Sequence, residues 1–198
     1  MAKYHELSLG QVEALVNKLG GMEGVKRFLS GELLVSPNCK VWKTWKTIKL
    51  GTGLKTASDF RKEVMKAGMK ISDWANDILG KPAFTATESV TEVELVVASV
   101  AELGFKDGAT RKDIYARAKE LGLDLCPPEV GPQLRLQYTD QPKDEWLVIA
   151  MEPIADSDGR LNLFLVGHDG GSRFLHASFG SPVDFWRGDR RFVFLRRK

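Results

Sequence analysis

The chain has 198 residues, 43% of them hydrophobic, which is enough for one domain or two small ones with a real core. No run of 18 apolar residues is present and no apolar leader opens the chain, so we expect a cytoplasmic protein that neither spans a membrane nor is exported. Two cysteines, Cys39 and Cys126, are too few for a disulfide scaffold, and three histidines without a C-x-x-C pair indicate no metal site and no cofactor.

The net charge of +3 hides an uneven distribution of charged residues. Residues 40–70 hold nine basic and two acidic side chains, and the last twelve residues hold six basic and one acidic. Residues 1–39 are balanced, so residues 71–186 carry a net charge of −9. The simplest interpretation is that basic and acidic segments face one another or are solvated.

The first elements are two short helices. Ser8 and Gln11 have the spacing of a capping box, and the residues that follow place four apolar side chains on one face of a helix over 8–19: Val12, Leu15, Val16 and Leu19. Residues 22–30 repeat the pattern more briefly before Gly31. The sequence therefore predicts a helical hairpin.

The next segment predicts one strand and two helices. Strand-forming residues fill 42–50 and end at Gly51. Thr56 caps a helix that closes at Gly68, and Ser72 caps a shorter helix that ends near Gly80. A polar linker and domain boundary near 82–90 would then separate a mainly helical unit with one strand, residues 1–85, from an α+β unit, residues 90–198.

The second half predicts a strand near 93–97, a helix capped by Thr110, and a series of strands. Four runs alternate with period two, with a weaker fifth at 174–177; the four are 134–138, 146–150, 161–165 and 192–195. Their connections are short and rich in turn residues, which favours an antiparallel meander. The expected class is α+β: a helical N-terminal unit, a strand-helix unit and an antiparallel β-meander.

No motif for catalysis is evident. The chain has no G-x-S-x-G and no H-E-x-x-H, and Cys126 before two prolines suits a buried structural thiol. The cluster Asp156-Ser-Asp158-Gly159 fits a turn better than a calcium loop, because the position of the bidentate glutamate is Leu165. Whether the chain is an enzyme stays open, with no catalytic residue to name.

The C-terminal segment has the composition of a binding surface. Between two expected strands it carries four residues typical of interaction hot spots: Phe185, Trp186, Arg187 and Arg190. One interpretation is an exposed loop within 168–190 that binds a macromolecular partner, most simply a protein. The other is a loop folded back over the sheet with Trp186 as its anchor, and the sequence leaves both open.

A basic segment supplies a second hypothesis, nucleic-acid binding. Residues 40–55 carry lysines at three-residue intervals beside two tryptophans, a combination that single-strand binders use: Trp42, Lys43, Trp45, Lys46 and Lys49. The basic C-terminus would assist if the fold brought it alongside: Arg190, Arg191, Arg196, Arg197 and Lys198. The competing interpretation is that the tryptophans anchor the core and the lysines face solvent.

Three phrases carry a resemblance to known sequences. Leu125–Tyr138, Trp146–Pro153 and the ending Arg191–Lys198 resemble a set of bacterial proteins of unknown function, a resemblance that spans most of the chain and implies no activity. The stretch Gly171–Phe194 resembles the last strands of C-type-lectin-like variable proteins of diversity-generating retroelements, whose aromatic-rich loop precedes a closing Phe-x-Phe-like strand. The glycine- and tryptophan-rich phrases of that fold are not evident upstream. The resemblance implies binding without catalysis.

Overall fold

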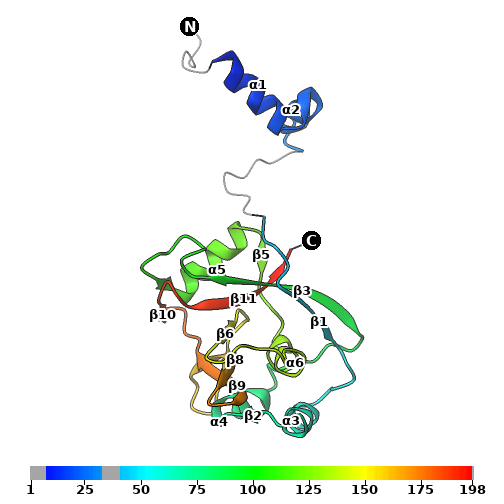
Figure 1. The fold of residues 1–198 in the computed structure, drawn as a ribbon, viewed down its shortest axis with the longest axis vertical. Helices are drawn as coiled ribbons and strands as arrows, with labels where there is room; N and C mark the ends of the chain where they lie inside the picture. Colours follow the sequence, from blue (N-terminus) through cyan, green and yellow to red (C-terminus); the bar gives the residue numbers. More distant parts are fainter. Residues whose placement is uncertain (1–7, 33–40, 198) are drawn as a thin grey trace. The chain divides into compact units, whose positions relative to one another are not determined.

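The structure, a computed structural model, describes residues 8–32 and 41–197 (Figure 1). The chain forms two compact units, Met1–Cys39 and Lys40–Lys198. Cys39 itself lies outside the described residues.

The N-terminal unit contains α1 (Leu9–Lys18) and α2 (Gly21–Leu29), so both predicted helices are confirmed. The predicted capping box is also present: the Ser8 hydroxyl accepts the Gln11 N–H at 3.3 Å, and the Gln11 side chain accepts the Ser8 N–H at 2.8 Å. No residue of α1 is buried, and large apolar side chains of both helices are exposed. This pair of helices therefore has almost no core of its own.

The second unit is built on a mixed nine-stranded sheet within residues 41–197, and seven of its strands follow one another in the order β1-β3-β11-β6-β8-β9-β2. The bounds along this order are β1 (Lys46–Leu50), β3 (Thr91–Ser99), β11 (Arg191–Arg196), β6 (Trp146–Ile149), β8 (Leu161–Asp169), β9 (Ser172–Phe179) and β2 (Lys70–Ile71). Neighbours are antiparallel except β11 with β6 and β2 with β9, which are parallel. Short strands add to this path: β5 (Leu123–Asp124) beside β11, and β7 (Ile154–Ala155) beside β8. A separate pair joins β4 (Ala109–Thr110) to β10 (Phe185–Trp186).

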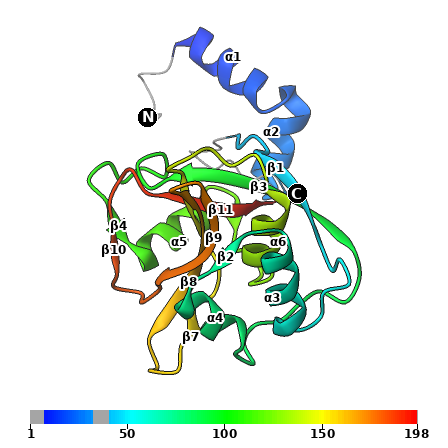
Figure 2. The same cartoon turned by 60° about the horizontal axis from the view of Figure 1, so that its bottom comes forward.

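Four helices complete this unit: α3 (Ala57–Lys66), α4 (Asp73–Leu79), α5 (Arg111–Glu120) and α6 (Val130–Gln137). The three predicted caps are confirmed, because the hydroxyls of Thr56, Ser72 and Thr110 each accept a backbone N–H three residues on. Helices α3 and α6 lie side by side, and α6 also packs against β8 and β9 (Figure 2). The α+β class predicted from the sequence is confirmed.

The predicted boundary near residues 82–90 needs correction. Strands from before it, β1 and β2, pair with β3 and β9 from after it, so one sheet spans the whole of 46–196. The compact units divide instead at Cys39 and Lys40. Backbone hydrogen bonds between distant strands, which no local composition signals, override the polar linker.

The meander also needs correction. Antiparallel neighbours β6, β8 and β9 form part of one, but β11 returns to lie between β3 and β6 and pairs in parallel with β6. The predicted strand over 134–138 is wrong, because these residues belong to α6. This helix is buried on most sides, so its apolar residues show no helical period that would distinguish it from a strand. The predicted strand over 42–50 begins only at Lys46.

Candidate functional site

One face of the central sheet carries a row of side chains that forms the floor of a cavity. In the β6·β8 pair Val148 lies opposite Leu165, and in the β8·β9 pair Leu165 lies opposite His176. Residues directly opposite on neighbouring strands point to the same face. Trp146 and Ser178 belong to the same face, two residues from Val148 and His176 respectively.

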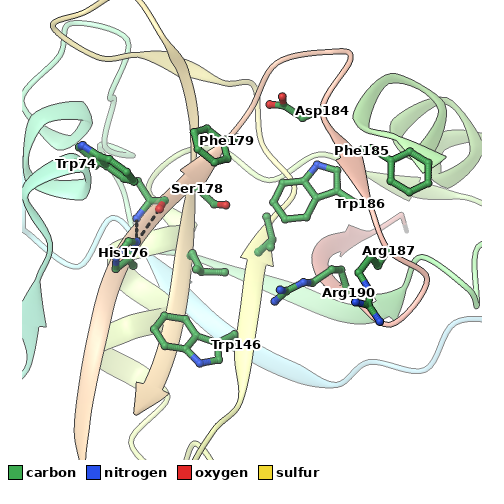
Figure 3. A pocket seen from close by; sticks show the side chains of 13 residues that line it. Trp74, Trp146, His176, Ser178, Phe179, Asp184, Phe185, Trp186, Arg187 and Arg190 are labelled. Carbon is green, nitrogen blue, oxygen red and sulfur yellow. Dashed lines mark hydrogen bonds between the residues drawn. The ribbon is translucent and has the colours of Figure 1, made fainter. Parts of the chain in front are cut away.

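The cavity over this floor is about 530 Å³ and is lined mainly by rings. Helix α4 supplies Trp74 on one side, and the end of β9 supplies Phe179 (Figure 3). Strand β10 supplies Phe185 and Trp186 on the opposite side, followed by a loop with Arg187 and Arg190. The four residues predicted from the C-terminal segment thus line one cavity together.

The aromatic side chains are positioned by contacts with one another. The His176 ring makes edge contacts with Trp74 at 6.4 Å and with Trp146 at 6.1 Å between centroids. Its Nδ1 lies 2.6 Å from the Ala177 carbonyl oxygen and 2.9 Å from the Ala177 backbone nitrogen, so it hydrogen-bonds the Ala177 backbone in either tautomer, and Nε2 has no hydrogen bond in the described part of the chain. Trp74 also lies 6.3 Å from the Phe179 ring. Packing therefore holds this side of the cavity in one arrangement.

The opposite side is held by the backbone. Strand β10 pairs with β4. The first residues of α5 also donate backbone hydrogen bonds to the loop just before β10, Arg111 to Asp184 O at 2.9 Å and Lys112 to Pro182 O at 3.1 Å. Gly108 has a φ of +109°, and a Cβ there would lie 2.7 Å from the Phe185 ring. Only glycine fits this position, since the conformation and the space both exclude a side chain.

The two interpretations of the C-terminal segment each describe part of it. Trp186 is only 8% exposed and packs on Phe192 with ring centroids 5.1 Å apart, as expected of an anchor. Phe185, however, is 64% exposed, and Arg187 and Arg190 are exposed as well. Among residues 8–32 and 41–197, the buried Trp186 Nε1 has no hydrogen-bond partner. Trp186 therefore fixes the loop, while its neighbours reach solvent.

The two arginines of the loop differ in their surroundings. Arg187 Nε lies 3.6 Å from Asp189 Oδ1. The Arg190 side chain points toward the cavity, between Trp146 and Trp186 (Figure 3), and forms no ion pair within residues 41–197. Asp184, the carboxylate that lines the cavity, accepts the Ser181 N–H at 2.6 Å.

The tryptophans of the basic segment lie in the structure as core residues. Trp42 is buried and its Nε1 donates to Leu121 O at 3.0 Å. Trp45 is partly buried and packs edge-on against Tyr138 at 5.0 Å. These are the positions expected from the interpretation that the tryptophans anchor the core, and the Trp42 ring is too buried to stack on a base.

The lysines of this segment differ among themselves. Lys46 Nζ lies 3.3 Å from Asp140 and 4.7 Å from the centre of the Tyr138 ring. Lys49 Nζ lies 3.9 Å from Glu92, and Lys43 is exposed. Two of the three predicted phosphate contacts therefore already have a carboxylate nearby.

Strand β3 separates β1 from the C-terminal strand and places carboxylates between them. Glu94 accepts hydrogen bonds from Arg196 at 2.8 Å and from Thr44 at 2.6 Å. Arg191 pairs with Glu145 at 2.7 Å, and Arg197 pairs with Asp124. Lys198 lies outside the described residues. The two basic segments thus flank an acidic strand.

The cavity contains residues that the sequence reasoning did not single out: Trp74, Trp146, His176 and Phe179. They come from α4, β6 and β9, far apart in the chain. The alternation within 146–150 and within 174–177 indicates which other residues of each strand share a face with Trp146 or with His176. It does not indicate that both strands pair with the same strand, β8. The register of the sheet is what brings them together.

Groups suited to catalysis or metal binding are few in the described residues. No cluster of three His, Cys, Asp or Glu side chains that could hold a metal ion occurs in residues 8–32 and 41–197. The Asp156 cluster forms a turn, as predicted, in which Asp156 accepts the N–H groups of Asp158 and Arg160. Cys126 is buried, as predicted, and burial raises the pKa of its thiol. No described helix has the length and apolar character required to cross a bilayer.

Comparison with known proteins adds no relative: no family model, no curated protein and no solved structure matches the chain. The resemblances to bacterial proteins and to C-type-lectin-like variable proteins therefore stay predictions.

Proposed function

We propose that this chain is a non-enzymatic binding module that recognises a protein partner through the surface around the cavity, named here the aromatic surface: Trp74, Trp146, Phe179, Phe185, Trp186, Arg187 and Arg190. The observation that carries the proposal is the meeting of these residues, from four separate elements, at one cavity on the sheet face.

The exposure of the rim supports a macromolecular partner. Phe179 is 60% exposed, Val183 is 77% exposed and Trp74 is 48% exposed, all at or beside the cavity. Large apolar side chains clustered in this way mark interaction sites, because an isolated protein gains nothing by presenting them to water. A concave centre with rigid aromatic walls and arginines at its edge is also where binding energy concentrates in interfaces.

A random peptide display library, selected on the immobilised full chain, tests the proposal. Selected peptides should bind the wild type and lose most of their affinity for Phe185→Ser and Phe179→Ser, which alter exposed rings and leave the core intact. Met65→Ser is the matched control, because Met65 is 69% exposed on α3 and does not line the cavity. Trp186 is unsuitable for this purpose, since its removal would also open the core.

Two results would overturn the proposal. One is the failure of any peptide to be enriched over the uncoated support. The other is enrichment of peptides that bind Phe185→Ser and Phe179→Ser as tightly as the wild type.

Nucleic-acid binding through residues 40–55 is the alternative, and it has less support. Its tryptophans pack in the core, and Lys46 and Lys49 lie beside carboxylates. Titration with a single-stranded oligonucleotide at low salt distinguishes the two functions. Tryptophan quenching that disappears with added salt and is weaker in Lys43→Glu/Lys46→Glu would favour the alternative, because phosphate contacts release counterions. The cytoplasmic location is a prediction that neither function requires.

A further inference from the structure

We infer that the partner segment presents an apolar side chain with a carboxylate close to it, and that Arg190, not Arg187, binds the carboxylate. This inference rests on the proposed function, since it names the chemistry that the aromatic surface would recognise.

The centre of the surface selects an apolar group. Its floor includes Val148 and Leu165, and ring edges and faces of the tryptophans enclose it. A volume of about 530 Å³ lies within the range of pockets that bury a compact ligand, roughly 300–1000 Å³. One or two side chains of a partner fit such a space, and burying them removes apolar surface from water on both sides.

The charge at the edge selects an anion. In Figure 3 the Arg190 side chain reaches toward the space between Trp146 and Trp186, and within residues 41–197 no carboxylate pairs with it. The next residue, Arg191, is already paired with Glu145 at 2.7 Å. A guanidinium without a counterion beside a partly enclosed cavity binds a carboxylate better than any neutral group, because the two planar groups form bidentate hydrogen bonds.

The nearby charges do not cancel this preference. Asp184 lines the cavity on the side away from Arg190 (Figure 3), and one of its oxygens accepts the Ser181 N–H at 2.6 Å. Arg187 faces Asp189 at 3.6 Å, so its charge is partly compensated before any partner binds. The imidazole of His176, on the opposite wall, adds no negative charge.

A cationic ligand is the opposing possibility, because clustered tryptophans can also hold an alkylammonium group against their faces. The position of Arg190 argues against it. A second cation placed in this cavity would meet a guanidinium in a space partly shielded from water, where like charges repel strongly.

The test is a display library with one fixed phenylalanine flanked on each side by three random positions, selected separately on the full-length wild type, Arg190→Glu and Arg187→Glu. The wild type should enrich Asp and Glu near the phenylalanine, and Arg187→Glu should retain that preference. Arg190→Glu should lose it and favour Lys and Arg. For one selected acidic peptide, Arg190→Gln should weaken binding about tenfold or more, since a charged hydrogen bond is lost.

The outcomes separate the inference from the function on which it rests. Peptides enriched without any charge preference, yet dependent on Phe179 and Phe185, would overturn the inference and leave the binding module standing. Lys and Arg enriched on the wild type would overturn it in favour of a cationic ligand, and an acidic preference unchanged in Arg190→Glu would remove the role of Arg190. Failure to enrich any peptide on the wild type would overturn the proposed function itself.

Discussion

Gly167 lies directly opposite Trp146 in the β6·β8 pair, and a Cβ built on Gly167 would lie 2.3 Å from the six-membered ring of that tryptophan. The missing side chain lets the indole rest on the backbone of β8. The wall of the cavity that Trp146 forms therefore depends on a residue that lines no part of the cavity.

Gly167→Ala should displace Trp146 and destabilise the fold by about 1–3 kcal/mol, the usual cost of overpacking. It should also weaken binding of any peptide selected on the aromatic surface. Urea unfolding and a peptide titration measure the two effects. Gly10→Ala is the control, because Gly10 is exposed in α1 with nothing within 4 Å of a built Cβ, and its stability should not fall. Equal stability of Gly167→Ala and the wild type would contradict the close packing of Trp146.

Helix α4, which carries Trp74, lies beside the β7–β8 turn (Figure 2), and Asp77 connects the two through Ser157, which predicts an acid-sensitive stability. Hydrogen bonds from Lys81 and from the backbone and hydroxyl of Ser157 lower the pKa of Asp77 to about 2. Because the folded state favours the carboxylate, its contribution is full above pH 4 and is lost as the pH falls toward 2. The Tm of Asp77→Asn should lie below that of the wild type at pH 6.

The difference in Tm between the two proteins should shrink as the pH falls through the pKa of about 2 and vanish below it. Asp158→Asn is the matched control, because Asp158 lies in the same turn and pairs with the exposed Arg160. A difference that stays constant between pH 6 and pH 2 would show that Asp77 acts through something other than its charge.

Local signals predicted the helices better than the sheet, for a physical reason. Ser8, Thr56 and Thr110 cap their helices through atoms three residues away, so the chemistry is visible in the sequence. The parallel pairing of β11 with β6 joins Phe192 to Val148, more than forty residues apart, and nothing in either strand specifies that partner. Contacts of this kind also decided which residues share the cavity.

The α6 segment is a second case in which the local sequence pattern predicted the wrong structure. Its alternation of Leu134 and Leu136 predicts a strand, yet the fold needs a helix that places Arg135 in the interior. A buried arginine is not a residue that hydrophobic periodicity counts. Phe185 and Arg190 were predicted to share a surface because aromatic and arginine residues stand close together in the sequence there, and both line the cavity, whereas Trp74 and His176 reach it only through the packing of distant elements.

Arg135 should contribute to stability through its hydrogen bonds, although it is a charged residue in the interior. It is fully buried and donates to Tyr138 O at 2.6 Å, Gly167 O at 3.1 Å and Gln141 Oε1 at 2.5 Å. Burial, with the charge of Arg173, lowers the pKa of Arg135 to about 10, so the guanidinium is still charged at neutral pH. Arg135→Met fills the space but leaves three buried acceptors without a donor.

We therefore expect Arg135→Met to lose about 3 kcal/mol, since each buried unpaired group costs about 1–3 kcal/mol and the relieved burial of charge returns part of this. Thermal unfolding at pH 7 measures the loss, with Arg187→Met as an exposed control. A variant as stable as the wild type would mean that the cost of burying the charge cancels its three hydrogen bonds.

Substitution of the buried Glu129 should cost more stability than substitution of an exposed carboxylate. It is fully buried, and its two oxygens accept the N–H groups of Gly51 at 2.8 Å and Thr87 at 2.7 Å. Gly51 follows β1 and Thr87 lies shortly before β3, so one carboxylate holds both ends of the connection between these two strands. Gln133 Nε2 donates to it as well, at 3.0 Å.

Glu129→Gln keeps the shape of the side chain but turns one acceptor into a donor that faces a backbone N–H. We expect a loss of about 2 kcal/mol or more, because one buried N–H is left unpaired. Hydrogen exchange should show the Gly51 or Thr87 amide opening first, before the strands themselves. Glu152→Gln, an exposed change of the same chemistry, should alter neither measurement. Unchanged protection of both amides in Glu129→Gln would mean that the loops are held by β1 and β3 alone.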